Sequence, residues 1–210
     1  MPKPMRRNQC EITDPKEIER ILSATNIGRL GTTGADGYPY IVPVNFVWME
    51  GKGYFHCALE GEKLDNIERD PRVCFEVDIP LAYLDSTFRP DRTVSQVHQF
   101  YHCIIIRGTA RVAPDGPLKT DALNALVAKH EGSTDFDPVT EDMPAYKMCH
   151  VIEIDPVSIS AKSDLYQGKP DGLRQDAADY LTGRGLPGDL EAARAMGVDA
   201  SGADEDGENS

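Results

Sequence analysis

The sequence lacks the features that mark secreted, zinc-binding or membrane-spanning proteins. Its five cysteines stand singly among 210 residues, with no CxxC pair and an odd total. Disulfide frameworks and zinc sites usually show cysteines at short paired spacings. No long apolar run is present, and the basic start MPKPMRRNQC is followed by the polar stretch EITDPKEIER rather than by a signal-peptide core. We therefore expect a cytoplasmic protein with reduced thiols, no metal site and no membrane contact.

Basic residues are also scarce. Lys and Arg number 22 against 35 Asp and Glu, so the formal net charge is -13. A surface of this charge repels nucleic acid, and we expect no nucleic-acid partner. Much of the acidity belongs to residues 199–210, which contain no Lys or Arg. This end is expected to be disordered.

A dinucleotide-binding fingerprint is missing too, because no GxGxxG motif follows a strand-like run. A nicotinamide cofactor, if one is used, would visit transiently rather than occupy a Rossmann domain.

Strand-like runs are what the chain does contain. They are rich in β-branched and aromatic residues, and turn clusters such as GADG and EGKG separate them. These runs are IGRLGTT, YPYIVPVNFVWM, GYFHCA, RVCFEVD, QFYHCIIIRGTARVA and MCHVIEIDPVSISAK. The last run is expected to form two short strands hinged at Pro156, and residues 79–95 a long loop. Hairpins without regular βαβ crossovers favour an antiparallel barrel over a doubly wound sheet.

Helical spacing of apolar residues interrupts the strands. It predicts an opening helix over 12–22, a short helix in GEKLDNIERDP that ends before Pro71, and a helix that includes residues 118–127. From about Gly168 onward Gly, Asp and Ala dominate, with short helices expected over 177–181 and 190–196. We expect two parts: a barrel domain over 1–165 and a partly helical extension over 166–210.

One strand-to-turn-to-helix passage has the form of an anion site. A strand ending at His56 and Cys57 leads through a Gly-containing turn into a helix with Lys63 in its first turn. Free amide groups and an ammonium would converge there on one phosphate. The alternative is a surface helix with a solvated lysine, and for His56 a histidine that bonds to the barrel backbone. His98 and His102 are four residues apart, but their surroundings indicate a strand rather than a metal-binding helix.

Several blocks of the sequence resemble a known family in order and spacing. The blocks are MRRNQCEITDPKEIERIL, GRLGTTGADGYPYIVPVNF, YFHCALEGEKLDNIERDPRVCFEVD, YHCIIIRGTARV and VIEIDPVSISAK. They resemble the nitroimidazole-reductase (Nim) branch of the pyridoxamine 5'-phosphate oxidase-like superfamily. The resemblance implies a mainly β (α+β) protein, a six-stranded antiparallel split β-barrel with short helices. It also implies a homodimer with FMN at the subunit interface.

The resemblance further implies roles for particular residues. His56 would stand beside the flavin and donate a proton to the acceptor as the catalytic residue. The implied cofactor-binding residues are Arg29, Val42, Pro43, Val44, Asn45, His56, Cys57, Ala58, Lys63, Asn66, Tyr101 and Arg107. Tyr101 and Arg107 lie on the strand that the partner subunit would contribute. Cys57 is interpreted as a small apolar filler rather than a reactive thiol.

These features together predict an FMN-dependent oxidoreductase. It would pass electrons from a reduced nicotinamide or another donor to a small acceptor, for example a nitroaromatic compound. The alternative is a non-catalytic flavin or haem carrier. Pyridoxamine 5'-phosphate oxidase activity ranks lower, because no cluster of basic residues for a substrate phosphate surrounds the predicted pocket.

Overall fold

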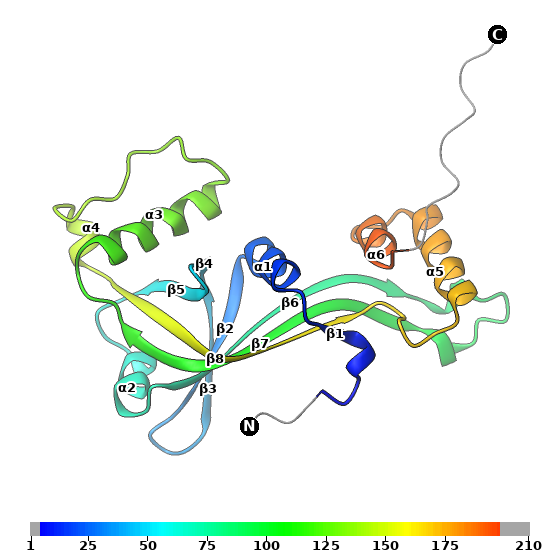
Figure 1. Ribbon diagram of the computed structural model, residues 1–210, viewed down its shortest axis with the longest axis horizontal. Coiled ribbons are helices and arrows are strands. Elements are labelled where there is room, and N and C mark those ends of the chain that lie inside the picture. Colours follow the sequence, from blue (N-terminus) through cyan, green and yellow to red (C-terminus); the bar gives the residue numbers. More distant parts are fainter. Residues whose placement is uncertain (1–4, 198–210) are drawn as a thin grey trace, which may run out of the picture. The chain divides into compact units, whose positions relative to one another are not determined.

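The structure of the chain is a computed structural model that describes residues 5–197. The predicted disorder of the acidic end therefore lies outside the described residues. The strands are β1 Glu11–Ile12, β2 Ile27–Thr33, β3 Pro39–Asn45, β4 Val47–Met49, β5 Lys52–Cys57, β6 Arg72–Leu84, β7 His98–Val112 and β8 His150–Asp164 (Figure 1). The helices are α1 Pro15–Ala24, α2 Glu62–Arg69, α3 Pro117–Glu131, α4 Pro144–Lys147, α5 Asp171–Arg184 and α6 Asp189–Ala195, with three short 3-10 turns. None of these helices is both long and apolar enough to cross a membrane.

The strands form one sheet, and the two strands at its opposite ends follow each other directly in the sequence. Its order is β3-β2-β6-β7-β8-β5-β4, with β1 paired to β8 outside this path. The pairs β2–β3, β2–β6, β4–β5 and β5–β8 are antiparallel. Only Phe46 separates β3 from β4, the strands at the opposite ends of the order. This arrangement confirms the expected α+β split-barrel class, with eight strands among the described residues instead of the six predicted.

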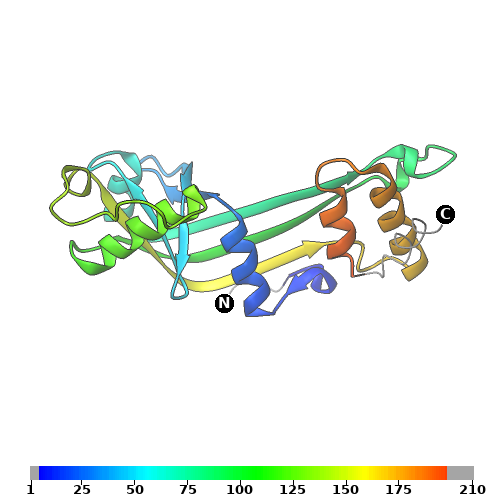
Figure 2. The same ribbon diagram turned by 90° about the horizontal axis from the view of Figure 1, so that it is seen from above.

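The chain divides into two compact units, each with its own core. Among the described residues, unit 1 contains 12–78 and 103–161, and unit 2 contains 5–11, 79–102 and 162–197. In unit 1, α3 and α4 pack on β4, β5 and β8 through a cluster that includes Tyr54, Leu126, Tyr146 and Val151. In unit 2, α5 and α6 lie side by side (Figures 1 and 2). The predicted domain boundary at 165/166 stays a prediction.

Three expected boundaries are wrong. The run 38–49 is two strands, because the side chain of Phe46 is fully buried and its ring packs edge-on against Phe75, with ring centroids 5.0 Å apart. The predicted loop 79–95 begins as strand, because Leu81, Ala82 and Leu84 are buried in the core of unit 2 and extend β6.

The third correction concerns Pro156, where β8 continues as one strand. Gly108 on β7 explains how the strand passes this point, since a Cβ at residue 108 would lie 2.2 Å from the carbonyl oxygen of Asp155. The missing side chain lets the two strands approach closely where proline donates no hydrogen bond.

Candidate functional site

The end of β5 directs His56 and Cys57 to opposite sides. His56 pairs with Val151 and is exposed, whereas Cys57 pairs with His150 and is buried. Burial raises the pKa of the Cys57 thiol, although the nearby Lys63 ammonium acts in the opposite direction. The thiol is therefore protonated near neutral pH and is not an activated nucleophile. Of this pair, only the side chain of His56 is exposed and able to contact a ligand. Ala58, the next residue after Cys57, is also exposed.

The first turn of α2 leaves a cation without an internal partner. Gly61 caps the helix at a φ of 134°, a left-handed backbone conformation that favours glycine, and its carbonyl accepts from Leu64 N at 2.8 Å. Lys63 is half-buried and makes no hydrogen bond or ion pair with any described residue. Four residues separate its helix from the end of β5. Glu62 and Asp65 share this turn and weaken its attraction for an anion.

Beside these residues, β3 forms one end of the sheet. It pairs with β2, and Val42 and Val44 are half-buried while Pro43 and Asn45 are exposed. An end strand presents backbone N–H and C=O groups that can bond to a ligand or a second chain. The four predicted β3 residues therefore offer backbone contacts, and Asn45 adds a side-chain amide.

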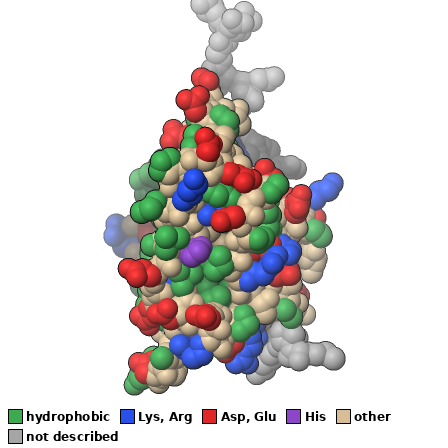
Figure 3. Space-filling model, turned by 90° about the vertical axis from the view of Figure 1, so that its left-hand side faces the viewer, with side chains coloured by type: hydrophobic (Ala, Val, Ile, Leu, Met, Phe, Trp, Pro, Cys, Tyr) green, Lys and Arg blue, Asp and Glu red, His purple; other side chains and the backbone are tan. Residues whose placement is uncertain are grey.

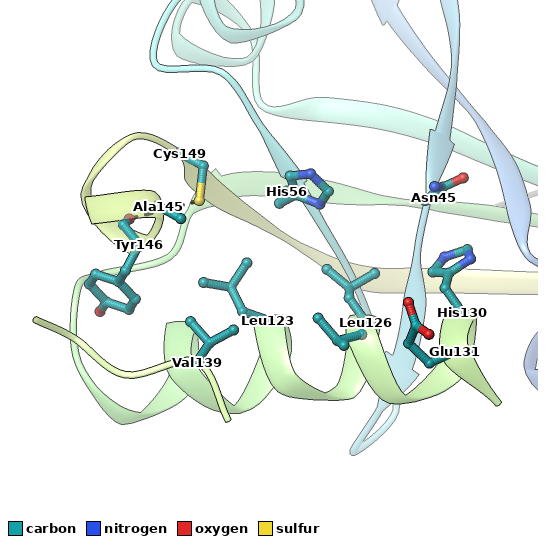
Figure 4. A pocket seen from close by; sticks show the side chains of 11 residues that line it. Asn45, His56, Leu123, Leu126, His130, Glu131, Val139, Ala145, Tyr146 and Cys149 are labelled. Atoms are coloured by element: carbon teal, nitrogen blue, oxygen red, sulfur yellow. Dashed lines mark hydrogen bonds between the residues drawn. The ribbon is translucent and has the colours of Figure 1, made fainter. Parts of the chain in front are cut away.

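Asn45 and His56 line the same cavity, which has a volume of about 440 Å³ (Figure 4). Its lining also includes Leu123, Leu126, Val127, His130, Glu131, Val139, Ala145, Tyr146 and Cys149. His130 and Glu131 stand at the end of α3 nearest Asn45, and Ala145, Tyr146 and Cys149 surround the opposite end. The left-hand face of Figure 1 shows apolar side chains around a histidine, with acidic and basic side chains about them (Figure 3). The cavity thus has one polar end and largely apolar walls.

Two predicted binding residues have partners within the chain. The Arg29 guanidinium donates to Glu76 at 3.1 Å and also to Asp78, and these carboxylates raise the pKa of Arg29. Asn66 is buried, donates to Thr32 Oγ1 at 3.0 Å and accepts from Arg69 at 2.9 Å. Arg29 is thus neutralised by its neighbours, and Asn66 joins α2 to β2.

Tyr101 and Arg107 are not brought to this cavity. Tyr101 belongs to unit 2, where its hydroxyl accepts a hydrogen bond from Lys162. Arg107 is exposed on β7 in unit 1 and lines a separate groove of about 530 Å³ that also contacts Ile41. His98 and His102 lie on β7 in unit 2; His98 pairs with Asp164 at 3.2 Å, and the Nδ1 of His102 shares a 2.8 Å hydrogen bond with Ser163.

The α3 wall of the cavity was missed by the sequence analysis. A signal was present, because Leu123, Leu126 and Val127 continue to His130 at i, i+3, i+4 and i+7, one face of a helix. The helix was expected, but its polar last turn was not assigned to the site. That assignment requires knowing that α3 packs beside β5.

Comparisons with known proteins identify the family. The profile of the pyridoxamine 5'-phosphate oxidase family matches residues 14–163, so the chain belongs to that family. One relative, a 5a,11a-dehydrotetracycline/5a,11a-dehydrooxytetracycline reductase from Streptomyces rimosus, is 33% identical over 105 residues. That match covers 48% of this chain and 64% of the relative, so the chain spans less than two thirds of its length.

Solved structures show the same fold. A candidate 5-nitroimidazole antibiotic resistance protein from Bacteroides thetaiotaomicron superposes with a TM-score of 0.62 at 22% identity, covering 73% of this chain and 86% of that one. A FAD- and haem-binding protein from Mycobacterium smegmatis gives a TM-score of 0.63 at 16% identity, with coverage of 80% and 79%.

Proposed function

We propose that this chain is an FMN-dependent oxidoreductase of the nitroimidazole-reductase type. The observation that carries the proposal is that His56, at the end of β5, and Asn45, on the end strand β3, line one cavity. Family membership supports it, as does the similarity to a reductase. The flavin would supply the redox chemistry, and the chain would position the acceptor.

The residues of this part of unit 1 fit a flavin monophosphate. Lys63 and the free amides at the start of α2 would hold the phosphate, and a single lysine there suits one phosphate group better than a diphosphate. The backbone of Val42, Val44 and Asn45 would run along the ring edge. His56, exposed at the cavity, would donate a proton to the reduced acceptor.

We also propose that a second copy of the chain completes the site. Ile41 of β3 and Val157 of β8 line one groove of the sheet and are 66% and 80% exposed. Apolar groups at this exposure favour burial against a matching surface. Tyr101 and Arg107 would then be offered to the flavin of the other copy.

The proposal is tested by titrating cofactor-free protein with FMN and with FAD, using Lys63→Ala and Lys16→Ala. Both lysines are the second residue of their helix, so the variants are matched. A charge-assisted hydrogen bond contributes about 1.5–3 kcal/mol, so Lys63→Ala should weaken FMN binding roughly tenfold or more. Lys16→Ala should leave it unchanged. Equal affinity of both variants would remove Lys63 from the site.

Absorption spectra during anaerobic addition of NADH or NADPH test the chemistry. Flavin bands that bleach support an oxidoreductase, whereas an intense Soret band in the purified protein would favour the haem carrier. His56→Ala should slow acceptor turnover about 100-fold or more, because general acid catalysis contributes on this scale, with little loss of bound flavin. Unchanged turnover per bound flavin would exclude His56 as the proton donor.

A further inference from the structure

The walls of the α3 cavity are held in place by internal contacts. The side chain of Asn124 donates to Val139 O at 3.1 Å and accepts from Val139 N at 2.7 Å. Both backbone groups of Val139 are therefore fixed to α3, with the Val139 side chain facing the cavity. In addition, Tyr146 Oη accepts from Gly116 N at 2.7 Å, which joins α4 to the start of α3.

The charged side chain that lines the cavity is acidic. Among the described residues, the lining contains no Lys or Arg, and Glu131 is its acidic residue. An anionic ligand would meet a carboxylate with no compensating cation among the lining residues. For the same reason the phosphate of a flavin does not belong inside it. His56, His130 and Asn45 instead offer hydrogen bonds to an uncharged polar group.

The size of the cavity also limits its ligand. A volume of about 440 Å³ lies within the roughly 300–1,000 Å³ range of sites for drug-sized molecules. Leu123, Leu126, Val127 and Val139 form an extended apolar wall, which a single five-membered ring would leave largely uncovered. Contact along the whole wall requires a longer apolar body.

We infer that this cavity binds an uncharged aromatic molecule of at least two rings, with a carbonyl, nitro or hydroxyl group at the end near His56 and His130. This inference rests on the proposed function, because it makes that molecule the electron acceptor. Asn124 is the positioning residue that holds the Val139 wall. Glu131 is the specificity-determining residue that disfavours anions.

Two fluorescent probes that differ by one sulfonate test the inference on the full chain. N-phenyl-1-naphthylamine is uncharged, and 8-anilino-1-naphthalenesulfonate is its anionic counterpart. We expect saturable binding of the uncharged probe and at least tenfold weaker binding of the anion. Glu131→Gln should reduce the difference in affinity between the two probes. The chain keeps most of its net negative charge in this variant, so the effect would come from the carboxylate in the cavity.

Two exposed alanines provide the matched steric variants. Ala145→Trp places a large ring at the cavity, whereas Ala35→Trp lies in the β2–β3 turn away from it. The first should weaken binding of the uncharged probe tenfold or more, and the second should not. Equal binding of both probes, or no effect of Ala145→Trp, would overturn the inference.

Adding FMN separates the failure of this inference from the failure of the proposed function. If FMN binds and leaves the uncharged probe in place, the acceptor assignment is supported. If FMN displaces the probe competitively, the cavity belongs to the cofactor and the assignment is overturned. If FMN does not bind but the probe results hold, the proposed function fails while the ligand class of the cavity stands.

Discussion

At the scale of single residues, Lys129 is a partly buried cation of unit 1 that three backbone carbonyls hold. Its ammonium donates to the carbonyl oxygens of Thr25 at 2.7 Å, Phe46 at 3.0 Å and Leu22 at 3.2 Å, and lies 4.0 Å from the centroid of the Phe46 ring. It thus satisfies carbonyls at the end of α1 and fixes the break between β3 and β4. Burial nevertheless lowers its pKa to about 8.

This shift predicts how stability depends on pH. Between about pH 8 and the ordinary lysine pKa of 10.5, the unfolded chain holds a proton that the folded chain has released. Raising the pH through this window therefore favours the folded state at this residue. The free energy of unfolding of the wild type minus that of Lys129→Met should rise from pH 7.5 to pH 10, as measured by urea titration.

The comparison with Lys129→Met is essential because other groups titrate nearby. Burial raises the pKa values of Tyr54 and Cys57, so their contributions to stability fall as pH rises. These contributions are common to both proteins and cancel in the difference. A difference that stays flat or declines with pH would contradict a lowered lysine pKa.

At the scale of elements, Asn124 should control the order of the segment that returns from α3 to α4. Asn124→Ala removes two hydrogen bonds to Val139 and leaves its backbone groups to find water. We expect a loss of about 1–3 kcal/mol in unfolding free energy. Amide hydrogen exchange should accelerate at Val139 while the amides of β5 keep their protection. Asn8→Ala, outside unit 1, serves as the control, and unchanged exchange at Val139 would contradict the role of Asn124.

The elements also show what local sequence can predict. Alternation and turn residues located most strands, and the helix after Gly61 was found from the spacing of Leu64 and Ile67. The break at Phe46 was invisible, because apolar alternation continues through it and burial of the ring against Phe75 decides the chain direction. Proline suggested a hinge at Pro156, but the decisive residue was Gly108 on the neighbouring strand.

The candidate site shows a similar division. His56 and Lys63 were predicted as site residues because they flank one short turn, which local sequence describes well. Whether Arg29 and Asn66 are free depends on partners far along the chain, Glu76 for the first and Thr32 for the second. Such pairings follow from strand register and helix packing, which a single sequence does not specify.

At the scale of the whole molecule, the proposed dimer makes a direct prediction. Ile41→Asp puts a charge on the exposed apolar face, and desolvating it in an interface is costly. The molar mass measured by light scattering after size exclusion should fall from twice the chain mass in the wild type to the chain mass of 23.1 kDa in the variant. Leu190→Asp, at a similarly exposed apolar residue of unit 2, should leave the mass unchanged. A monomeric wild type would contradict the dimer proposal.

The close approach at Gly108 has a consequence for how this protein can diversify. A side chain there would push against the carbonyl of Asp155 on β8. The same strand carries Val151, which pairs with His56 of the cavity. Substitutions at residue 108 would therefore alter the cavity from a distance, without touching any ligand. In a selection for activity on new acceptors, we expect substitutions at His130 or Val139 among the selected variants, whereas residue 108 should remain glycine in all of them.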